Sequence, residues 1–121
     1  MFKKILIIDD DVEYSEELSE ILRDNGHVVE TIIFNRKNLD QFQPLKYDVI
    51  ILDFKMPDIT GVDILNRISL SGPRPMVFFI SGRPFLEKLL SPDDLLSKVT
   101  EIIPKPFSIA EFLLKIDTLS G

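Results

Sequence analysis

Apolar residues gather in three short, uninterrupted runs along the chain. These runs occupy residues 5–8, 49–52 and 76–80. A stretch that is apolar at every position is typical of a parallel strand with helices on both faces, because neither face meets water. We therefore expect these runs to form the central strands of a sheet.

Two further apolar segments carry weaker strand signals. Residues 28–33 contain Glu30 and Thr31, and residues 102–103 are followed at once by Pro104. Polar residues within a strand and a proline at its end are easier to accommodate at the border of a sheet. Both segments therefore predict peripheral strands.

The segment after the first strand has the pattern of an amphipathic helix. Leu18, Ile21 and Leu22 fall on one side of such a helix. Asn25 and Gly26 follow, and these residue types favour the left-handed backbone conformation that often ends a helix. We expect the first helix to end at this pair.

Later segments continue the alternation of strands with helices. Leu39 and Phe42 suggest a short second helix. Three further helix starts are indicated by hydroxyl residues that open capping patterns, namely Thr60, Ser91 and Ser108. The alternation predicts an α/β fold with a mostly parallel sheet, right-handed crossovers and helices on both faces.

Composition narrows the class of protein. The chain has 121 residues, of which 45% are hydrophobic, so we expect one domain spanning residues 1–121. Its net charge of −6 opposes direct binding to nucleic acid. It has no cysteine and a single histidine, His27, which excludes disulfides and zinc sites built from these residues. The first apolar run is too short for a signal peptide or membrane span, so we expect a cytoplasmic protein without membrane contact.

Charged and hydroxyl residues follow the expected strands. Aspartates at 9–11 follow the first strand, Asp53 ends the third, Ser81 follows the fourth and Lys105 follows the fifth. The carboxyl ends of parallel strands share one edge of the sheet, which is where open α/β sheets bind ligands. Two carboxylates ~4 Å apart repel by about 4 kcal/mol at an effective dielectric of about 20, so a compensating cation is needed.

The chemistry of these groups points to a divalent cation and phosphoryl transfer. Oxygen ligands without sulfur or imidazole suit Mg²⁺ or Mn²⁺, and Lys105 adds a fixed positive charge. Positioning and charge neutralisation do most of the work in phosphoryl transfer. Asp53 would then be the nucleophile.

Four segments together carry a resemblance to a known family. They are residues 5–11 (ILIIDDD), 48–61 (DVIILDFKMPDITG), 78–82 (FFISG) and 104–107 (PKPF). In this order they resemble the receiver domain of two-component response regulators, of the chemotaxis-receiver type. The resemblance covers nearly the whole chain. It implies a flavodoxin-like, doubly wound α/β fold with a five-stranded parallel sheet in the order 2-1-3-4-5 and helices on both faces.

The resemblance also implies a role for each matching residue. Asp53 matches the phosphoacceptor, Ser81 the hydroxyl that bonds the phosphoryl oxygen, and Lys105 the cation that neutralises it. Asp10 matches a direct metal ligand and Asp9 its partner, which often acts through water. The full set of implied metal ligands is Asp9, Asp10, Asp53 and the backbone carbonyl of Lys55.

A receiver of this kind takes its phosphoryl group from a histidine kinase or a histidine phosphotransfer protein and then changes a protein-binding face. Because it catalyses only its own phosphorylation and dephosphorylation, we do not expect a turnover enzyme. One alternative is a receiver-like protein-binding module with a vestigial pocket that acts regardless of phosphorylation. Another is a small Mg²⁺-dependent phosphohydrolase, although 121 residues leave little room for a substrate pocket.

The chain departs from the family pattern near its fifth strand. Ile102 stands where receivers usually carry an aromatic side chain that moves on activation. The segment before it is rich in apolar residues, more than one helix face can bury. We therefore expect the 83–103 face to contact a downstream protein or a second copy of the chain.

Three polar residues close to these segments have simpler explanations. We expect Asp11 to cap a helix or form a turn, and His27 to line the start of a peripheral strand without a catalytic role. Tyr14 lies one helical turn before Leu18. It belongs either to the core stripe or to a docking surface for the phosphoryl donor.

Overall fold

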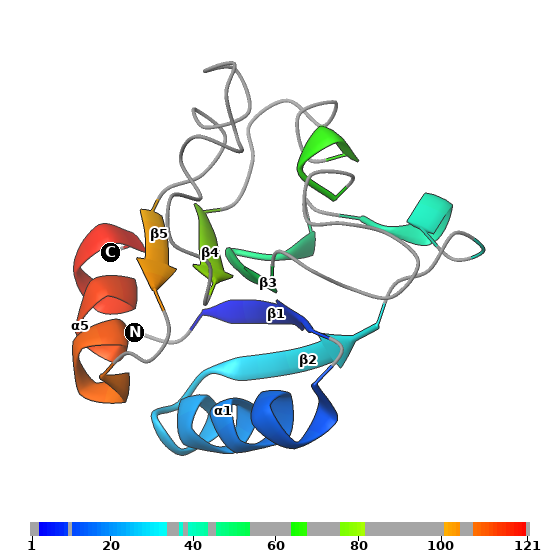
Figure 1. The fold of residues 1–121 in the computed structure, drawn as a ribbon. Helices are drawn as coiled ribbons and strands as arrows, with labels where there is room; N and C mark the ends of the chain where they lie inside the picture. The colour runs from blue at the N-terminus through cyan, green and yellow to red at the C-terminus, as the bar shows by residue number, and fades with distance from the viewer. Residues whose placement is uncertain are drawn as a thin grey trace.

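The computed structural model describes residues 3–9, 11–33, 37, 39–43, 46–53, 64–67, 76–81, 101–104 and 108–120. Within them the elements are β1 (Lys4–Ile8), α1 (Val12–Asp24), β2 (Val28–Ile32), the 3₁₀ helix η1 (Leu39–Gln41), β3 (Val49–Asp53), β4 (Met76–Ser81), β5 (Glu101–Pro104) and α5 (Ile109–Ser120). Residues 64–67 are also helical. Figure 1 shows α1 running beneath β2 and α5 standing beside β5.

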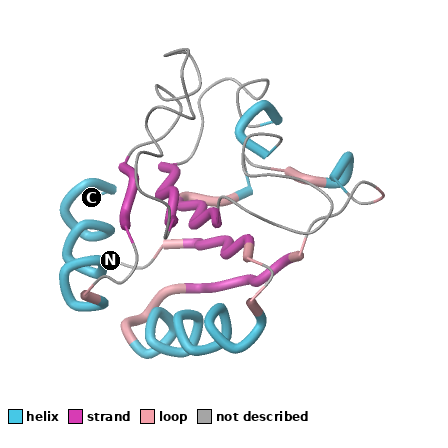
Figure 2. Tube along the Cα trace, viewed as in Figure 1, coloured by secondary structure: helices cyan, strands magenta, loops and turns pink. Residues whose placement is uncertain are grey.

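The strands form one five-stranded sheet in the order β2-β1-β3-β4-β5, which Figure 2 shows in a single colour. All four pairings are parallel. The three fully apolar runs became the central strands β1, β3 and β4, and the two interrupted segments became the borders β2 and β5. The expected strand order and the expected central and peripheral positions are therefore confirmed.

Helices cover both faces of the sheet. Side chains along each strand alternate between the two faces, so every central strand contributes to two buried clusters. On one face, Ile5 and Ile7 belong to a buried cluster with Leu18 and Leu22 of α1 and with Phe112 and Ile116 of α5. On the other face, Leu6 and Ile8 belong to a second cluster with the helical Ile64 and Leu65. The two clusters are the hydrophobic core of the domain.

The helix boundaries follow the capping chemistry that the sequence predicts. The side chain of Asp11 accepts a hydrogen bond from the backbone N–H of Tyr14 at 3.0 Å, so Asp11 is the N-cap of α1. Gly26 ends that helix with a φ of 92°, a left-handed conformation that glycine adopts without steric cost. At α5, the N–H of Glu111 donates to Oγ of Ser108 at 3.3 Å.

The short second helix that Leu39 and Phe42 predict is present as a 3₁₀ helix. Between β2 and β3, Leu39–Gln41 form a 3₁₀ helix of three residues, closed by the bond from the Phe42 N–H to the Leu39 carbonyl at 3.1 Å. Lys46 is also in 3₁₀ conformation. Two apolar residues give too little buried area to hold a longer amphipathic helix in place. The helix expected to start at Ser91, and most of the 83–103 face, lie outside the described residues.

Candidate functional site

The predicted site residues lie at the carboxyl edge of the sheet. Ile8 of β1 is in register with Leu52 of β3, so Asp9 follows β1 at the level of Asp53. Asp53 is in turn level with Ile80 of β4, one residue before Ser81. Neighbouring strands lie about 4.8 Å apart. The fold therefore brings Asp9, Asp53 and Ser81 to one edge of the sheet on three adjacent strands.

Asp9 is a buried carboxylate with a defined hydrogen bond. Its side chain is only 6% exposed, and Oδ1 accepts the backbone N–H of Asp11 at 3.0 Å. Asp11 also caps α1, and its carbonyl accepts the N–H of Ser15 at 3.0 Å. Because a buried carboxylate is stable only when it is hydrogen-bonded or paired with a cation, the start of α1 holds the negative charge of Asp9 at this edge.

Other predicted site residues lie outside the described part of the chain. These are Asp10, Lys55 and Lys105. The side chains of Asp53 and Ser81 are likewise outside it, although their backbones end β3 and β4. Among the described side chains no three of the types His, Cys, Asp and Glu lie close enough to hold a metal ion, and the predicted metal set needs Asp10 and Asp53. Their roles in phosphoryl transfer and metal binding stay predictions.

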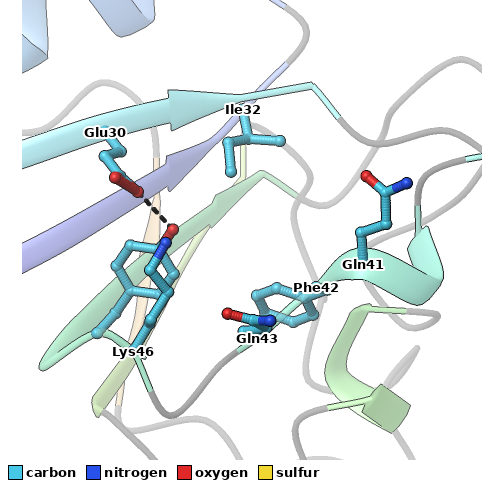
Figure 3. Close-up of a pocket in the computed structure, with 7 residues that line it drawn as sticks. Glu30, Ile32, Gln41, Phe42, Gln43 and Lys46 are labelled. Carbon is cyan, nitrogen blue, oxygen red and sulfur yellow. Dashed lines mark hydrogen bonds between the residues drawn. The ribbon is translucent and has the colours of Figure 1, made fainter.

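The sequence pattern did not reveal a polar pocket on the β2 side of the sheet. The hydroxyl of Tyr47 donates to Oε2 of Glu30 at 2.5 Å, and the pocket beside this pair has a volume of about 190 Å³. Its lining residues are Glu30, Ile32, Gln41, Phe42, Gln43, Lys46 and Tyr47. Figure 3 shows Glu30 on β2 and Gln41 on η1 at opposite sides of the pocket.

Electrostatics hold this pair in one protonation state. The hydrogen bond from Tyr47, helped by the nearby Lys46 and Lys4, lowers the pKa of Glu30. Burial, together with the hydrogen bond to Glu30 and its negative charge, raises the pKa of Tyr47 to about 12. The ammonium groups of Lys4 and Lys46 lie 5.6 and 5.9 Å from the centre of the Tyr47 ring, within the range of a cation–π interaction. A neutral phenol and an ionised carboxylate are thus both favoured.

His27 lies at the amino end of the sheet, away from the aspartates. It is 6% exposed, and its Nδ1 accepts the backbone N–H of Lys3 at 3.0 Å. Burial lowers the pKa of His27; the charge of Asp117 opposes this effect, whereas the N-terminus and Lys3 reinforce it. The predicted place of His27 at the start of β2 is confirmed.

Tyr14 lies on α1, partly buried against the cluster that contains Leu18. This position supports the core alternative for Tyr14. No helix among the residues that the structure describes is both long enough and apolar enough to span a membrane.

Comparisons with known proteins converge on one family. A family profile described as the response regulator receiver domain matches residues 5–117. The probable transcriptional regulatory protein SilR from Salmonella typhimurium is 30% identical over 116 residues, which cover 96% of this chain and 50% of SilR. The chain therefore spans about half the length of the curated relatives that it matches.

Solved structures agree with this match. The non-phosphorylated HemR receiver domain from Leptospira biflexa superposes with a TM-score of 0.80 at 26% identity, covering 98% of this chain and 94% of that one. The response regulator TrrA from Thermotoga maritima, solved in complex with Mg²⁺-BeF, has a TM-score of 0.76 at 24% identity, covering 97% and 98% of the two chains. At 24% identity, the similarity to TrrA supports the fold alone.

Proposed function

Because the chain belongs to the response regulator receiver domain family, we propose that Asp53 accepts a phosphoryl group with the help of a divalent cation. The proposal extends the family assignment to named residues of this chain. Phosphorylation would then change a surface that contacts another protein.

One observation carries the proposal. The parallel register places Asp53 on the strand between β1 and β4, with Asp9 following one neighbour and Ser81 ending the other. A structural turn needs no such convergence of two carboxylates and a hydroxyl. Acidic groups crowded at the carboxyl edge of an α/β sheet are typical of a functional site.

The donor set fits a hard divalent cation. Asp9, Asp10, Asp53 and the backbone carbonyl of Lys55 offer only oxygen ligands, which Mg²⁺ and Mn²⁺ prefer. Asp9 is buried, and the N–H of Asp11 fixes its carboxylate at the carboxyl edge of the sheet. A bound cation would stabilise the negative charge of this carboxylate. When bound, the cation would neutralise negative charge on the phosphoryl oxygens.

In the proposed reaction a carboxylate oxygen of Asp53 attacks the phosphorus of a phosphohistidine. The new O–P bond forms as the P–N bond to the donor imidazole breaks and its electron pair returns to that nitrogen. A proton taken from solvent by the other ring nitrogen makes the leaving imidazole neutral. The ammonium of Lys105 and the hydroxyl of Ser81 would stabilise the transferred phosphoryl oxygens. These residues modify their own chain once per cycle, so no turnover of a free substrate is proposed.

A histidine kinase or a histidine phosphotransfer protein is the proposed donor, because such donors serve two-component response regulators. The names of relatives such as SilR describe transcriptional regulatory proteins about twice as long as this chain, so any output of that kind remains a proposal for the longer protein. The 83–103 face stays a predicted contact for a downstream protein or a second copy.

Intact mass spectrometry tests the proposal. The protein is incubated with a small acyl-phosphate donor and Mg²⁺, and one added phosphoryl group is expected on the native chain. Asp53→Asn should abolish the addition. Asp40→Asn, which changes an exposed aspartate paired with Arg67, should leave it intact. Failure of the native chain to react would instead support the vestigial module, and repeated hydrolysis of a phosphate ester would support the phosphohydrolase.

A further inference from the structure

A second recess lies between the outer side of α1 and the border strand β2. Its volume is about 530 Å³. The residues that line it are Glu16, Ser19, Glu20, Arg23, Asp24 and Thr31, and we refer to it as the α1–β2 groove. Figure 1 shows α1 and β2 side by side at the border of the sheet. None of these residues takes part in the site at the carboxyl edge.

The charge of the α1–β2 groove is predominantly negative. Three exposed carboxylates, those of Glu16, Glu20 and Asp24, line it against one guanidinium, that of Arg23. Arg23 is already engaged, because its Nη2 donates to the carbonyl of Val29 at 2.9 Å. The groove therefore attracts cationic groups.

An unsatisfied hydroxyl provides an independent reason to expect a ligand. Ser19 also lines the groove and is only 2% exposed. Its Oγ is buried and has no hydrogen-bond partner, alone among the buried polar side-chain atoms of the described residues. An unpaired buried hydroxyl destabilises a fold, so each native exception needs an explanation. A donor that enters the groove would provide the missing hydrogen bond once the Ser19 side chain turns its hydroxyl toward the groove.

The spacing of the carboxylates favours several basic side chains along one peptide segment over a single metal ion. Glu16, Glu20 and Asp24 follow one another at intervals of four residues, which corresponds to a rise of about 6 Å along a helix. Alternate side chains of an extended strand are about 6.7 Å apart on one face. The described part of the chain has no compact acidic cluster suited to a metal ion. Basic side chains at every second position of an extended segment match this spacing.

The border of the sheet supplies backbone groups for the same segment. Among the strands that the structure describes, β2 pairs only with β1. The N–H of Val28 bonds to the Lys3 carbonyl at 3.0 Å. Because backbone groups alternate along a parallel ladder, the N–H and C=O of Thr31 point away from β1, toward the open border. Arg23 covers the Val29 carbonyl on that side, which prevents a continuous ladder with another sheet edge.

From these observations we propose that the α1–β2 groove binds an extended, lysine- or arginine-bearing segment of a partner protein. Its cationic groups meet the carboxylates of Glu16, Glu20 and Asp24, and one donor reaches Oγ of Ser19. A second copy of this chain would present the same negative groove and is repelled, and nucleic acid is repelled for the same reason. This inference does not depend on phosphorylation of Asp53.

Peptide binding tests the charge and the spacing together. The probe is the blocked peptide acetyl-Thr-Lys-Thr-Lys-Thr-Lys-amide, titrated at low salt into the isotopically labelled protein while amide NMR shifts are recorded. We expect the shifts to centre on Ser19 and Thr31 and to weaken with added salt. The isomer acetyl-Lys-Lys-Lys-Thr-Thr-Thr-amide has the same charge without the alternation and should bind more weakly. Equal affinity for both peptides, or shifts centred elsewhere, would overturn the proposal.

Matched variants identify the groups that bind. Glu20→Gln should weaken binding of the alternating peptide about 2- to 5-fold, the effect of one exposed charge pair. Glu17→Gln removes the same charge from an exposed position on the same helix that does not line the groove, and it should change affinity less than about 2-fold. Equal losses for the two variants would show a nonspecific charge effect and contradict the assignment.

Ser19→Ala separates a binding role from a structural one. Removing an unpaired hydroxyl should leave the melting temperature unchanged or higher, because no hydrogen bond is lost, while binding of the peptide weakens. A lower melting temperature with unchanged binding would contradict the role of Ser19. A dimer seen by sedimentation and abolished by Glu20→Gln would assign the groove to a second copy and overturn the proposal.

Discussion

The hydrogen bond between Tyr47 and Glu30 leads to a prediction that can be measured on a single side chain. The chain has two tyrosines and no tryptophan, so in a Tyr14→Phe background the absorbance of tyrosinate reports only Tyr47. We expect Tyr47 to ionise at a pKa of about 12. Burial is the largest cause of this shift, followed by the hydrogen bond to Glu30 and then its negative charge.

Replacing the acceptor separates these causes. In Glu30→Gln the amide oxygen can still accept the hydroxyl, but the negative charge that opposes ionisation is removed. The pKa of Tyr47 should therefore fall and yet stay above 10, because the burial remains. The same reasoning fixes the sign of the pH dependence. The neutral phenol stabilises the fold below pH 10, the ordinary pKa of tyrosine, and this contribution is lost as the pH rises from 10 toward 12.

Tyr47→Phe gives the energetic weight of the hydrogen bond. A hydrogen bond to a charged group contributes roughly 1.5 to 3 kcal/mol to stability. The lower end applies here, because Glu30 is only half-buried and can return to water when it loses its partner. A loss of about 1.5 kcal/mol would lower the melting temperature of a domain of this size by about 6 °C.

Urea denaturation with a double-mutant cycle of Tyr47→Phe and Glu30→Gln measures this coupling. The two single changes should not add, since each removes the same charge-assisted interaction. The reasoning would be refuted by a Tyr47 that ionises near pH 10, or by a Tyr47→Phe variant with unchanged stability. Either result would mean that the pair is open to solvent.

Two further predictions concern the core and the amino end of the sheet. Phe112 is 1% exposed and meets Phe78 edge to face with ring centres 5.3 Å apart, so Phe112→Ala should lower the free energy of unfolding by about 3 to 5 kcal/mol in urea. Leu114 of the same helix is 66% exposed, and Leu114→Ala should change the free energy of unfolding by less than about 0.5 kcal/mol. Similar losses of stability in Phe112→Ala and Leu114→Ala would contradict the assigned packing. For His27, the only histidine, NMR titration should give a midpoint below 6.5. Its neutral form contributes fully to stability above pH 6.5, and this contribution falls as the pH drops through the lowered pKa, a slope that His27→Gln should remove.

The sheet was predictable because its signals are local and repeated. An uninterrupted apolar run identifies a strand covered on both faces, and Glu30 within the second strand marks a border position. The caps at Asp11 and Gly26 were also readable, because each depends on the chemistry of one or two neighbouring residues. The strand order needed the family resemblance, since the runs alone do not say which strands are neighbours.

Contacts between distant segments were not predictable in the same way. The bond between Tyr47 and Glu30 joins residues 17 positions apart, and it exists only once β2 and β3 lie on either side of β1. Arg23 on the Val29 carbonyl likewise depends on where α1 meets the border strand. None of these residues belongs to a recognisable sequence motif. Only the folded geometry therefore reveals the two contacts.

The two proposed binding regions share α1, and the way this helix is held indicates how they relate. Its first turn is fixed by Asp11, whose N–H also orients Asp9, and its inner side is anchored by the fully buried Leu18 and Leu22. The charged groups of the groove lie on the outer side of the helix and are exposed. A segment bound there meets them without displacing the buried anchors. Coupling between two sites requires an element with two arrangements that both sites bias. Binding to the exposed outer side of α1 requires no second arrangement of this helix. We therefore infer that the groove binds its partner independently of the chemistry at Asp53.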